Sequence, residues 1–292
     1  MMFDDVEKSG KGFGGFDESW DVAEIIFLGA PLKSPNSPNV GVTKSPEGIR
    51  RASLELESFL PTSGIEIFEE ISVGDIGNIS NSLNFKKSRE KIMEITEKII
   101  EKGKIPALLG GEHLVSELAV ANMNNPFILF LDAHRDLRET YRNEKISHAT
   151  IARRMLDLVP SERLIQVGVR SCSKKEEEFS SRENIPTFAA REVINNPSNV
   201  LREINDLIDD NPVYLSIDLD VLDPAFAPAV TTPAPGGLSS LDLLDLLRGF
   251  RKLDIQGFDL VELDSNQVGK KNTSIVAAKV IYEILGVLGE SD

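Results

Sequence analysis

The side chains best suited to bind metal ions gather in four short motifs of this 292-residue sequence. Its three histidines lie in Gly110-Gly111-Glu112-His113, Asp132-Ala133-His134-Arg135-Asp136 and Ser147-His148-Ala149, and Asp218-Leu219-Asp220-Val221-Leu222-Asp223 adds further carboxylates. Imidazole nitrogens and carboxylate oxygens are ligands of divalent cations of hard to intermediate character. Two imidazoles with closely spaced aspartates therefore predict a pair of metal ions, and such a pair is typical of hydrolases.

The spacing within these motifs supports this interpretation. Asp132, His134 and Asp136 occupy alternate positions, and alternate side chains of an extended backbone point to the same side. Asp218 and Asp220 repeat the spacing after another apolar segment, where burying two carboxylates is costly without cations. A calcium loop of the EF-hand type is excluded, because its sixth position requires glycine and holds Asp223 here.

Three further residues have alternative roles. His113 follows two glycines that let the backbone approach a site closely, and its neighbouring motifs favour a metal ligand over an isolated core histidine. His148 stands at the expected start of a helix. It is either a proton carrier at the site or a surface residue. Glu262 follows an expected strand. Either it binds a guanidinium group through paired hydrogen bonds, or it is a surface residue at the end of the strand.

Short apolar segments alternate with amphipathic ones along the chain. Strands are expected near 25–29, 65–68, 106–109, 127–131, 164–169, 212–217 and 257–261, and helices near 45–60, 86–102, 114–123, 148–158, 190–208, 239–252 and 274–288. Several strands are apolar throughout, as in a parallel sheet covered by helices on both faces. We expect a single-domain, three-layer α/β/α fold with a mainly parallel, doubly wound sheet. The motifs then lie at the carboxyl ends of strands, where such sheets bind ligands.

Composition narrows the function and the location. The net charge is −15, with 47 acidic and 32 basic residues, and no basic cluster is large enough to bind nucleic acid. Residues 1–20 are acidic and glycine-rich, so a flexible N-terminal arm is expected before a catalytic domain over 21–292. No apolar run approaches the roughly 20 residues of a membrane helix. The single cysteine, Cys172, favours a reducing compartment. We expect a cytoplasmic protein without nucleic-acid or membrane partners.

The motifs together resemble those of the ureohydrolases, the family of arginases and agmatinases, and are most similar to agmatinases of archaea and bacteria. The resemblance extends from about Ile25 to Leu288 and covers the segments 110–113, 132–136, 216–224 and 232–237. It implies an arginase-like fold and two Mn²⁺ ions per subunit. It also implies a homo-oligomer, a trimer or a hexamer, because these are the assemblies common in the family.

The resemblance further implies a role for each candidate residue. One manganese ion would be held by His113, Asp132, Asp136 and Asp218, and the other by Asp132, His134, Asp218 and Asp220. In this family a hydroxide shared by the two ions attacks the guanidinium carbon, and Asp136 also orients it. His148 matches the histidine that transfers a proton, and Glu262 matches the glutamate that binds the guanidinium. The expected reaction is hydrolysis of agmatine to putrescine and urea.

Some residues depart from the family pattern near the expected pocket. Glu112 replaces the usual aspartate, and the family's glycine-rich segment reads Ala229, Thr231 and Ala234 where two glycines and a glutamate are usual. Loss of glycine alters a loop that needs a positive φ. These changes bear on the identity of the substrate more than on metal binding, and they leave open a non-catalytic metal-binding homologue.

The segment 137–147 leaves the substrate open. Glu139 or Glu144 is suited to the distal ammonium of agmatine, whereas Arg138 or Arg142 is suited to a distal carboxylate. Arginine, guanidinobutyrate and formiminoglutamate therefore remain alternatives to agmatine as the small guanidino or formimino substrate. A dinuclear phosphoesterase is less favoured, because it needs more histidine or asparagine ligands than this chain supplies.

Overall fold

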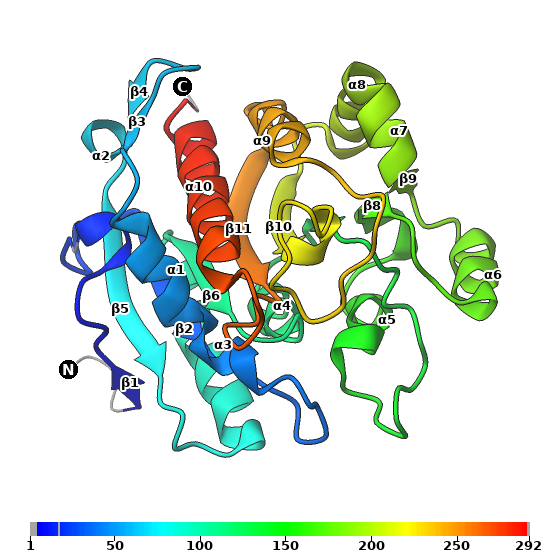
Figure 1. Cartoon of the computed structure of the whole chain (residues 1–292), viewed down its shortest axis with the longest axis horizontal. Coiled ribbons are helices and arrows are strands. Elements are labelled where there is room, and N and C mark those ends of the chain that lie inside the picture. Colours follow the sequence, from blue (N-terminus) through cyan, green and yellow to red (C-terminus); the bar gives the residue numbers. More distant parts are fainter. Residues whose placement is uncertain (1–4, 17, 291–292) are drawn as a thin grey trace.

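A nine-stranded sheet runs through the middle of the protein (Figure 1), as seen in a computed structural model that describes residues 5–16 and 18–290. The strand order is β1-β5-β2-β6-β11-β10-β7-β8-β9. The strands are β1 (Val6–Glu7), β2 (Ile25–Ala30), β5 (Val73–Ile79), β6 (Ile105–Gly110), β7 (Phe127–Leu131), β8 (Leu164–Val169), β9 (Thr187–Ala189), β10 (Pro212–Asp218) and β11 (Asp254–Val261). Within the described residues every pair in this sheet is parallel except β1 with β5. A separate ribbon pairs β3 (Phe59–Leu60) with β4 (Ile65–Glu66).

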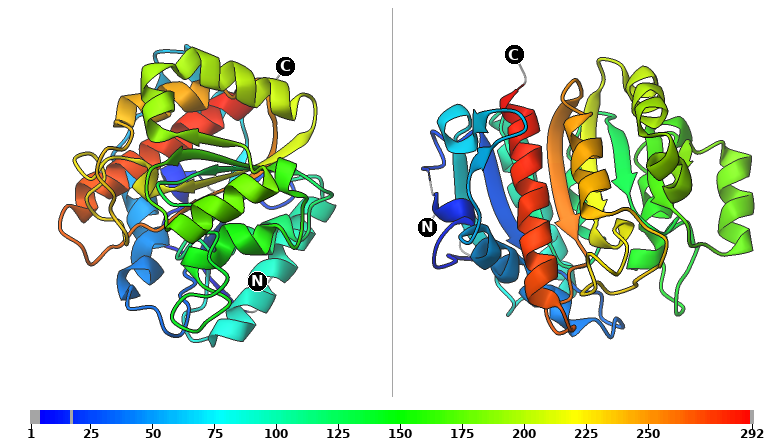
Figure 2. Two further views of the ribbon diagram at one scale, coloured as in Figure 1. Left: turned by 90° about the vertical axis from the view of Figure 1, so that its right-hand side faces the viewer. Right: turned by 45° about the horizontal axis from the view of Figure 1, so that its top comes forward.

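Helices cover both faces of this sheet, and Figure 2 shows the sheet between the two helical layers. The helices are α1 (Ser45–Ser53), α2 (Ile67–Glu70), α3 (Phe85–Glu101), α4 (Val115–Val120), α5 (Ile151–Met155), α6 (Lys174–Glu183), α7 (Ala190–Asn195), α8 (Pro197–Ile208), α9 (Ser240–Arg248) and α10 (Lys270–Gly289). One apolar core joins the sheet to α1, α7, α8, α9 and α10, and a second joins it to α3, α4 and α5. The predicted three-layer, mainly parallel fold is confirmed.

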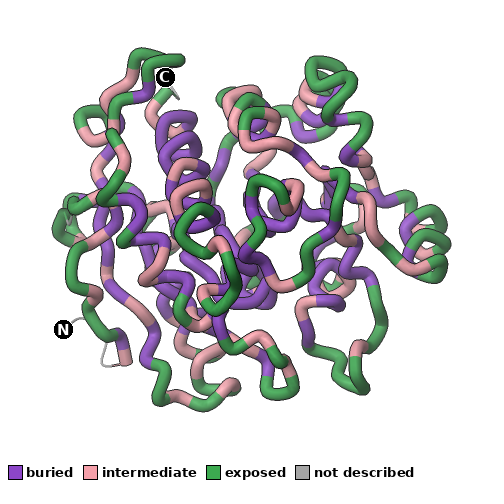
Figure 3. Tube along the Cα trace, in the orientation of Figure 1, coloured by how far each residue is buried: buried purple, intermediate pink, exposed green. Residues whose placement is uncertain are grey.

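The burial of the strands explains their continuous apolar sequences. All six residues of β2 and all five of β7 are buried, and the tube in Figure 3 shows the buried segments running through the centre of the molecule. Successive side chains of β2 enter opposite cores, since Phe27 packs in the first core and Ile26 and Leu28 in the second. A strand with a core on each side gains no advantage from alternating polar residues.

The N-terminal segment is packed rather than free. Val6 pairs with Ile79 of β5, and Phe13 is 0% exposed and stacks on Phe27 with ring centroids 4.8 Å apart. Val6 and Phe13 are therefore packed against the sheet, and the flexibility of the expected arm stays a prediction. Residues 1–4 and 17 of the expected arm lie outside the described residues. The domain boundary at residue 21 stays a prediction.

Two other differences from the expected elements concern strand β5 and the segment 190–208. Strand β5 was not expected, because its glycines, Asp75 and Asn78 interrupt the apolar pattern. The single helix expected over 190–208 is two helices, since Pro197 has no backbone N–H to donate and begins α8 instead.

Helix α10 is long and apolar enough to cross a membrane by length and composition, with a mean hydropathy of 1.3. No such segment was expected from the sequence. In the fold 67% of this apolar window is buried, and α10 packs against α1 and α9. That placement is typical of the core helix of a globular domain.

A buried ion pair joins α1 to β5. Arg50 is 1% exposed, and its Nε and Nη2 atoms donate to the two carboxylate oxygens of Asp75 at 2.6 and 2.8 Å. The backbone N–H groups of Phe13 and Gly77 donate to the same carboxylate at 2.9 and 3.0 Å. The pair therefore ties the N-terminal segment to the sheet.

We expect Asp75→Ala to be strongly destabilising, because it leaves the Arg50 charge buried and unpaired. Breaking such a pair typically costs about 3–5 kcal/mol of unfolding free energy, which chemical denaturation measures. The matched control is Asp157→Ala, since Asp157 is exposed and forms only a surface pair with Arg154 at 3.3 Å. Its expected effect is below about 1 kcal/mol. Equal effects of the two variants would contradict this account of the Arg50 pair.

Candidate metal centre

The expected metal ligands meet at the carboxyl ends of adjacent strands. His113 follows β6 in the turn before α4, Asp132 follows β7, Asp218 is the last residue of β10 and Glu262 follows β11. These four strands lie side by side in the order β6-β11-β10-β7. Residues separated by up to 149 positions, such as His113 and Glu262, are therefore neighbours.

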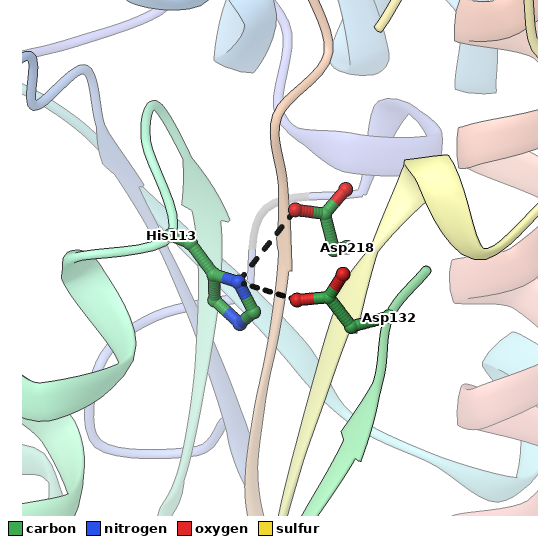
Figure 4. Close-up of side chains that lie close together, drawn as sticks. All are labelled: His113, Asp132 and Asp218. Carbon is green, nitrogen blue, oxygen red and sulfur yellow. Dashed lines mark ion pairs between the residues drawn. The ribbon is translucent and has the colours of Figure 1, made fainter. Parts of the chain in front are cut away.

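His113 and three aspartates form the first group of candidate ligands. The Nδ1 atom of His113 lies 3.3 Å from Asp132 Oδ2, 3.5 Å from Asp136 Oδ2 and 3.6 Å from Asp218 Oδ2. Figure 4 shows the His113 ring pointing toward the carboxylates of Asp132 and Asp218. Ligand atoms of these three residues lie within 4.8 Å of one another, close enough to hold one metal ion.

A second group lies beside the first and shares one of its members. His134 Nδ1 lies 2.9 Å from Asp220 Oδ2 and 3.6 Å from Asp132 Oδ1. Asp132, His134 and Asp220 again bring their ligand atoms within 4.8 Å. Because Asp132 turns one oxygen toward each histidine, its carboxylate is placed to bridge two cations.

Unpartnered polar atoms show that these groups fit metal ions. His113 Nδ1 and Asp132 Oδ2 are buried and have no hydrogen-bond partner among the described residues. Such atoms are rare in folded proteins, because each loses its hydration without replacement. A divalent cation would supply the missing partner, and nitrogen with carboxylate oxygen is a donor set that such ions accept.

The hydrogen bonds behind His113 fix which ring nitrogen faces the site. Ser216 Oγ donates to Asp259 Oδ1 at 2.8 Å, and Tyr214 donates to the other oxygen of Asp259 at 2.7 Å. Since the one proton of the Ser216 hydroxyl is used there, its oxygen accepts from His113 Nε2 at 2.9 Å. Nε2 therefore carries the proton, and Nδ1 keeps its lone pair toward the carboxylates.

Asp259 is a residue of this centre that the sequence analysis missed. It is fully buried within β11, and its hydrogen bond with Ser216 connects it to His113. The available signal was a carboxylate in the middle of an apolar strand, which is costly unless it is hydrogen-bonded.

Backbone geometry and short-range hydrogen bonds position the other ligands. Asp136 and Glu262 adopt φ values of 49° and 64°, in the left-handed region that residues other than glycine seldom occupy. Such strain collects at functional sites. The backbone N–H of Ala133 donates to Asp220 Oδ1 at 3.0 Å, and that of Asp220 donates to Asp218 Oδ1 at 2.8 Å.

Burial and mutual repulsion make several of the carboxylates hard to ionise. Burial, and then the charge of Asp132, raises the pKa of Asp136 to about 7. Burial, and then the charge of Asp220, raises the pKa of Asp218 well above its usual range. Asp132 differs: burial would raise its pKa, but its interactions with His113 and His134 in their protonated forms outweigh burial and lower it.

Metal-free protein should therefore lose stability as the pH rises from 5 to 8. Folded Asp136 and Glu262, with pKa values of about 7 and about 8, hold protons there that the unfolded chain has lost. His134 acts in the same direction, since its pKa of about 11 makes its contribution disappear as the pH rises above 6.5. Of these four residues, only His148 opposes the trend, because burial lowers its pKa.

The measurement is the Tm of chelator-treated protein across this pH range. Each kcal/mol lost corresponds to roughly 2–4 °C for a chain of this size. Saturating Mn²⁺ should flatten the decline, because cations favour the ionised carboxylates. A metal-free Tm that stays constant or rises from pH 5 to 8 would refute this electrostatic description.

Glu262 lies beside the metal groups, where the sequence analysis expected it. Its side chain is buried, with Oε1 accepting from the His113 backbone N–H at 2.7 Å and Oε2 accepting from the Thr231 hydroxyl. Burial, and then the charge of Glu112, raises the pKa of Glu262 to about 8. Thr231, one of the departures from the family pattern, thus contacts a candidate site residue. Its neighbour Thr232 donates to Asp220 Oδ2 at 3.1 Å.

His148 lies at the rim, in the short helix η3 (His148–Thr150). With His134 and Asp136 it lines a cavity of about 280 Å³, whose outer wall includes Arg138 and Tyr141. Its Nδ1 is buried without a hydrogen-bond partner among the described residues. This open nitrogen is available to a molecule that enters the cavity.

Comparison with known proteins agrees with this arrangement. The Arginase family pattern matches residues 23–286. The chain is 34% identical to an agmatinase of Bacillus anthracis over 294 residues, covering 98% of each chain. It is 31% identical to a guanidinobutyrase of Pseudomonas aeruginosa over 278 residues, covering 92% of this chain and 87% of the relative. The crystal structure of the agmatine ureohydrolase of Thermoplasma volcanium superposes with a TM-score of 0.88 at 30% identity, covering 97% of this chain and 95% of that one.

The chain belongs to the arginase family. The predicted resemblance to ureohydrolases is confirmed, and so is the prediction that the protein is a hydrolase of this type.

Proposed function

We propose that this protein hydrolyses agmatine to putrescine and urea with two Mn²⁺ ions per subunit. The observation that carries this proposal is the shared carboxylate of Asp132, which belongs to both groups of candidate ligands. A bridging carboxylate with one imidazole on each side is suited to two ions held close together. The oxygen-rich donor set favours manganese among the metals that accept imidazole.

The proposed ligands are those assigned by resemblance. His113, Asp132, Asp136 and Asp218 would hold one ion, and Asp132, His134, Asp218 and Asp220 the other. When bound, the two ions supply a nucleophile at neutral pH by lowering the pKa of water. The Ser216–Asp259 hydrogen bond supports this role, because it keeps the lone pair of His113 Nδ1 directed at the site.

The remaining site residues act on the substrate. Glu262 binds the guanidinium, and its two fixed oxygens orient the plane of that group. Asp136 orients the attacking water toward the guanidinium carbon. As the bond from that carbon to the alkyl nitrogen breaks, His148 delivers a proton to the departing amine, and urea remains.

The distal ammonium of agmatine is assigned to Glu144. Glu144 lines a small cavity together with His148 and Arg142, and its Oε1 accepts from the Asn36 amide at 2.6 Å. Guanidinobutyrate is the second candidate, favoured by Arg138 and Arg142, which lie 5.3 and 5.4 Å from the centroid of the Tyr141 ring. An arginine there offers a paired contact to a carboxylate.

Urea release from manganese-loaded protein separates these candidates. Agmatine, arginine, guanidinobutyrate, guanidinopropionate and formiminoglutamate are offered in parallel, and formamide is measured for the last. Urea from agmatine alone supports the proposal, whereas urea from guanidinobutyrate alone moves the substrate to a guanidino acid. No product from any compound, with two ions bound, would refute the proposed reaction and favour a non-catalytic homologue.

We further propose a cytoplasmic homo-oligomer, a trimer or a hexamer, without nucleic-acid or membrane partners. The acidic net charge of −15 supports the absence of nucleic acid. Light scattering of the eluting protein measures the subunit number, and a monomer would refute this part of the proposal.

A further inference from the structure

Glu112 is a buried carboxylate to which the roles above assign no function. Its side chain is 0% exposed in the turn between β6 and α4, one residue before His113. Oε2 accepts a hydrogen bond from the backbone N–H of Ser34 at 2.9 Å. Oε1 is buried and has no hydrogen-bond partner among the described residues. One oxygen is thus anchored, and the other is available.

The surroundings of Glu112 place it at the site rather than in the core behind it. The next residue, His113, donates its backbone N–H to Glu262 Oε1 at 2.7 Å, so the turn that carries Glu112 lies against Glu262. Ser34, to which Glu112 is anchored, lines a small cavity together with His148. Glu112 is therefore linked to Glu262 through its neighbour His113, and through Ser34 to the cavity that His148 lines.

Two carboxylates in one buried region require a positive partner, because each raises the cost of charging the other. No lysine or arginine of residues 5–16 and 18–290 forms an ion pair with either Glu112 or Glu262. Glu112 is also outside both groups of candidate metal ligands. The proposed metal ions would be held by other residues, so the unpartnered oxygen of Glu112 remains available to a molecule that enters the site.

A guanidinium group meets this requirement. It is planar, positively charged and has N–H donors on three nitrogens, more than one carboxylate can accept. We propose that Glu112 Oε1 accepts a hydrogen bond from the substrate guanidinium opposite Glu262, so that two carboxylates grip the cation. This inference rests on the proposed function. Its consequence is discrimination between substrate and product, since neutral urea gains far less from a second carboxylate and leaves more readily.

The test compares binding of guanidinium chloride and of urea to manganese-loaded protein by calorimetry. Glu112→Gln removes the charge but keeps the shape, so guanidinium binding should weaken about tenfold or more, as for loss of a hydrogen bond to a charged group. Urea binding should change by less than about threefold, the lower end of the range for a neutral hydrogen bond, because glutamine keeps an oxygen that accepts from urea. Glu112→Asp keeps the charge but shortens the side chain by one methylene. Its preference for guanidinium over urea should lie between those of the original protein and Glu112→Gln. In Glu117→Gln, a half-buried control paired with Arg89 at 3.1 Å, both affinities should be unchanged.

An unchanged ratio of the two affinities in Glu112→Gln would overturn the inference, and a lower Tm in that variant would then mark a structural role. If Glu112→Gln does not fold, the ratio of guanidinium affinity to urea affinity is measured in Glu112→Asp instead. A ratio equal to that of the original protein would contradict the proposed contact between Glu112 and the guanidinium. The binding assay needs no turnover. Absence of urea release by the original protein therefore refutes the proposed reaction, whereas an unchanged ratio refutes only the role of Glu112.

Discussion

Asp132→Asn is expected to reduce urea release by about 10³-fold or more in kcat, equivalent to about 4 kcal/mol of transition-state stabilisation. The effect is large because Asp132 directs one oxygen to His113 and the other to His134. Replacing one oxygen by an amide removes a negative ligand that both ions would share. The loss is measured as kcat at saturating manganese and substrate.

Metal binding separates this explanation from simple unfolding. Manganese should raise the Tm of the original protein and have little effect on that of Asp132→Asn, because only the former binds both ions. The matched control is Asp157→Asn, an exposed aspartate that lies outside both candidate ligand groups. Activity of Asp132→Asn within tenfold of the original protein would remove the shared carboxylate from the mechanism.

Glu262→Gln is expected to lower kcat/KM by about 10²–10³-fold, as for removing one partner of a buried charge pair, about 3–4 kcal/mol. The replacement keeps the size of the side chain, and its amide oxygen can still accept from the His113 backbone N–H. It removes the negative charge that attracts the guanidinium. The measurement is the rate of urea release at substrate concentrations below KM.

The control for Glu262 is Glu178→Gln on α6, where the exposed glutamate forms only a surface pair with Lys174 at 3.5 Å. Such pairs contribute little to stability, so its kcat/KM should be unchanged. Manganese stoichiometry should be the same in both variants, because Glu262 belongs to neither candidate ligand group. Loss of bound metal in Glu262→Gln would instead assign this residue a role in the metal centre.

Much of the fold follows from the sequence because its strands have cores on both faces. Such strands read as apolar runs, and β2, β6, β7, β8, β10 and β11 all lie within or around the expected ranges. The clustering of His113, Asp132 and Asp218 follows from the same pattern. Each residue comes at the end of a buried strand, and parallel strands end at one edge of the sheet.

The elements that the sequence did not predict depend on contacts between distant segments. Strand β5 forms where Asp75 meets Arg50, 25 positions away, and no local pattern encodes that pair. Phe13 orders a glycine-rich segment only because Phe27 and Tyr282 surround it. Asp259 acts through Ser216 on a histidine that follows another strand. Residue spacing along one chain carries no information about such partners.

The most direct test of the central claim is a titration of metal-free protein with Mn²⁺, in which bound metal and urea release from agmatine are measured on the same samples. Two ions sharing Asp132 predict that two equivalents bind per chain and that activity reaches its maximum only as the second binds. Full activity with one equivalent, or urea release that does not depend on metal, would contradict the dinuclear centre.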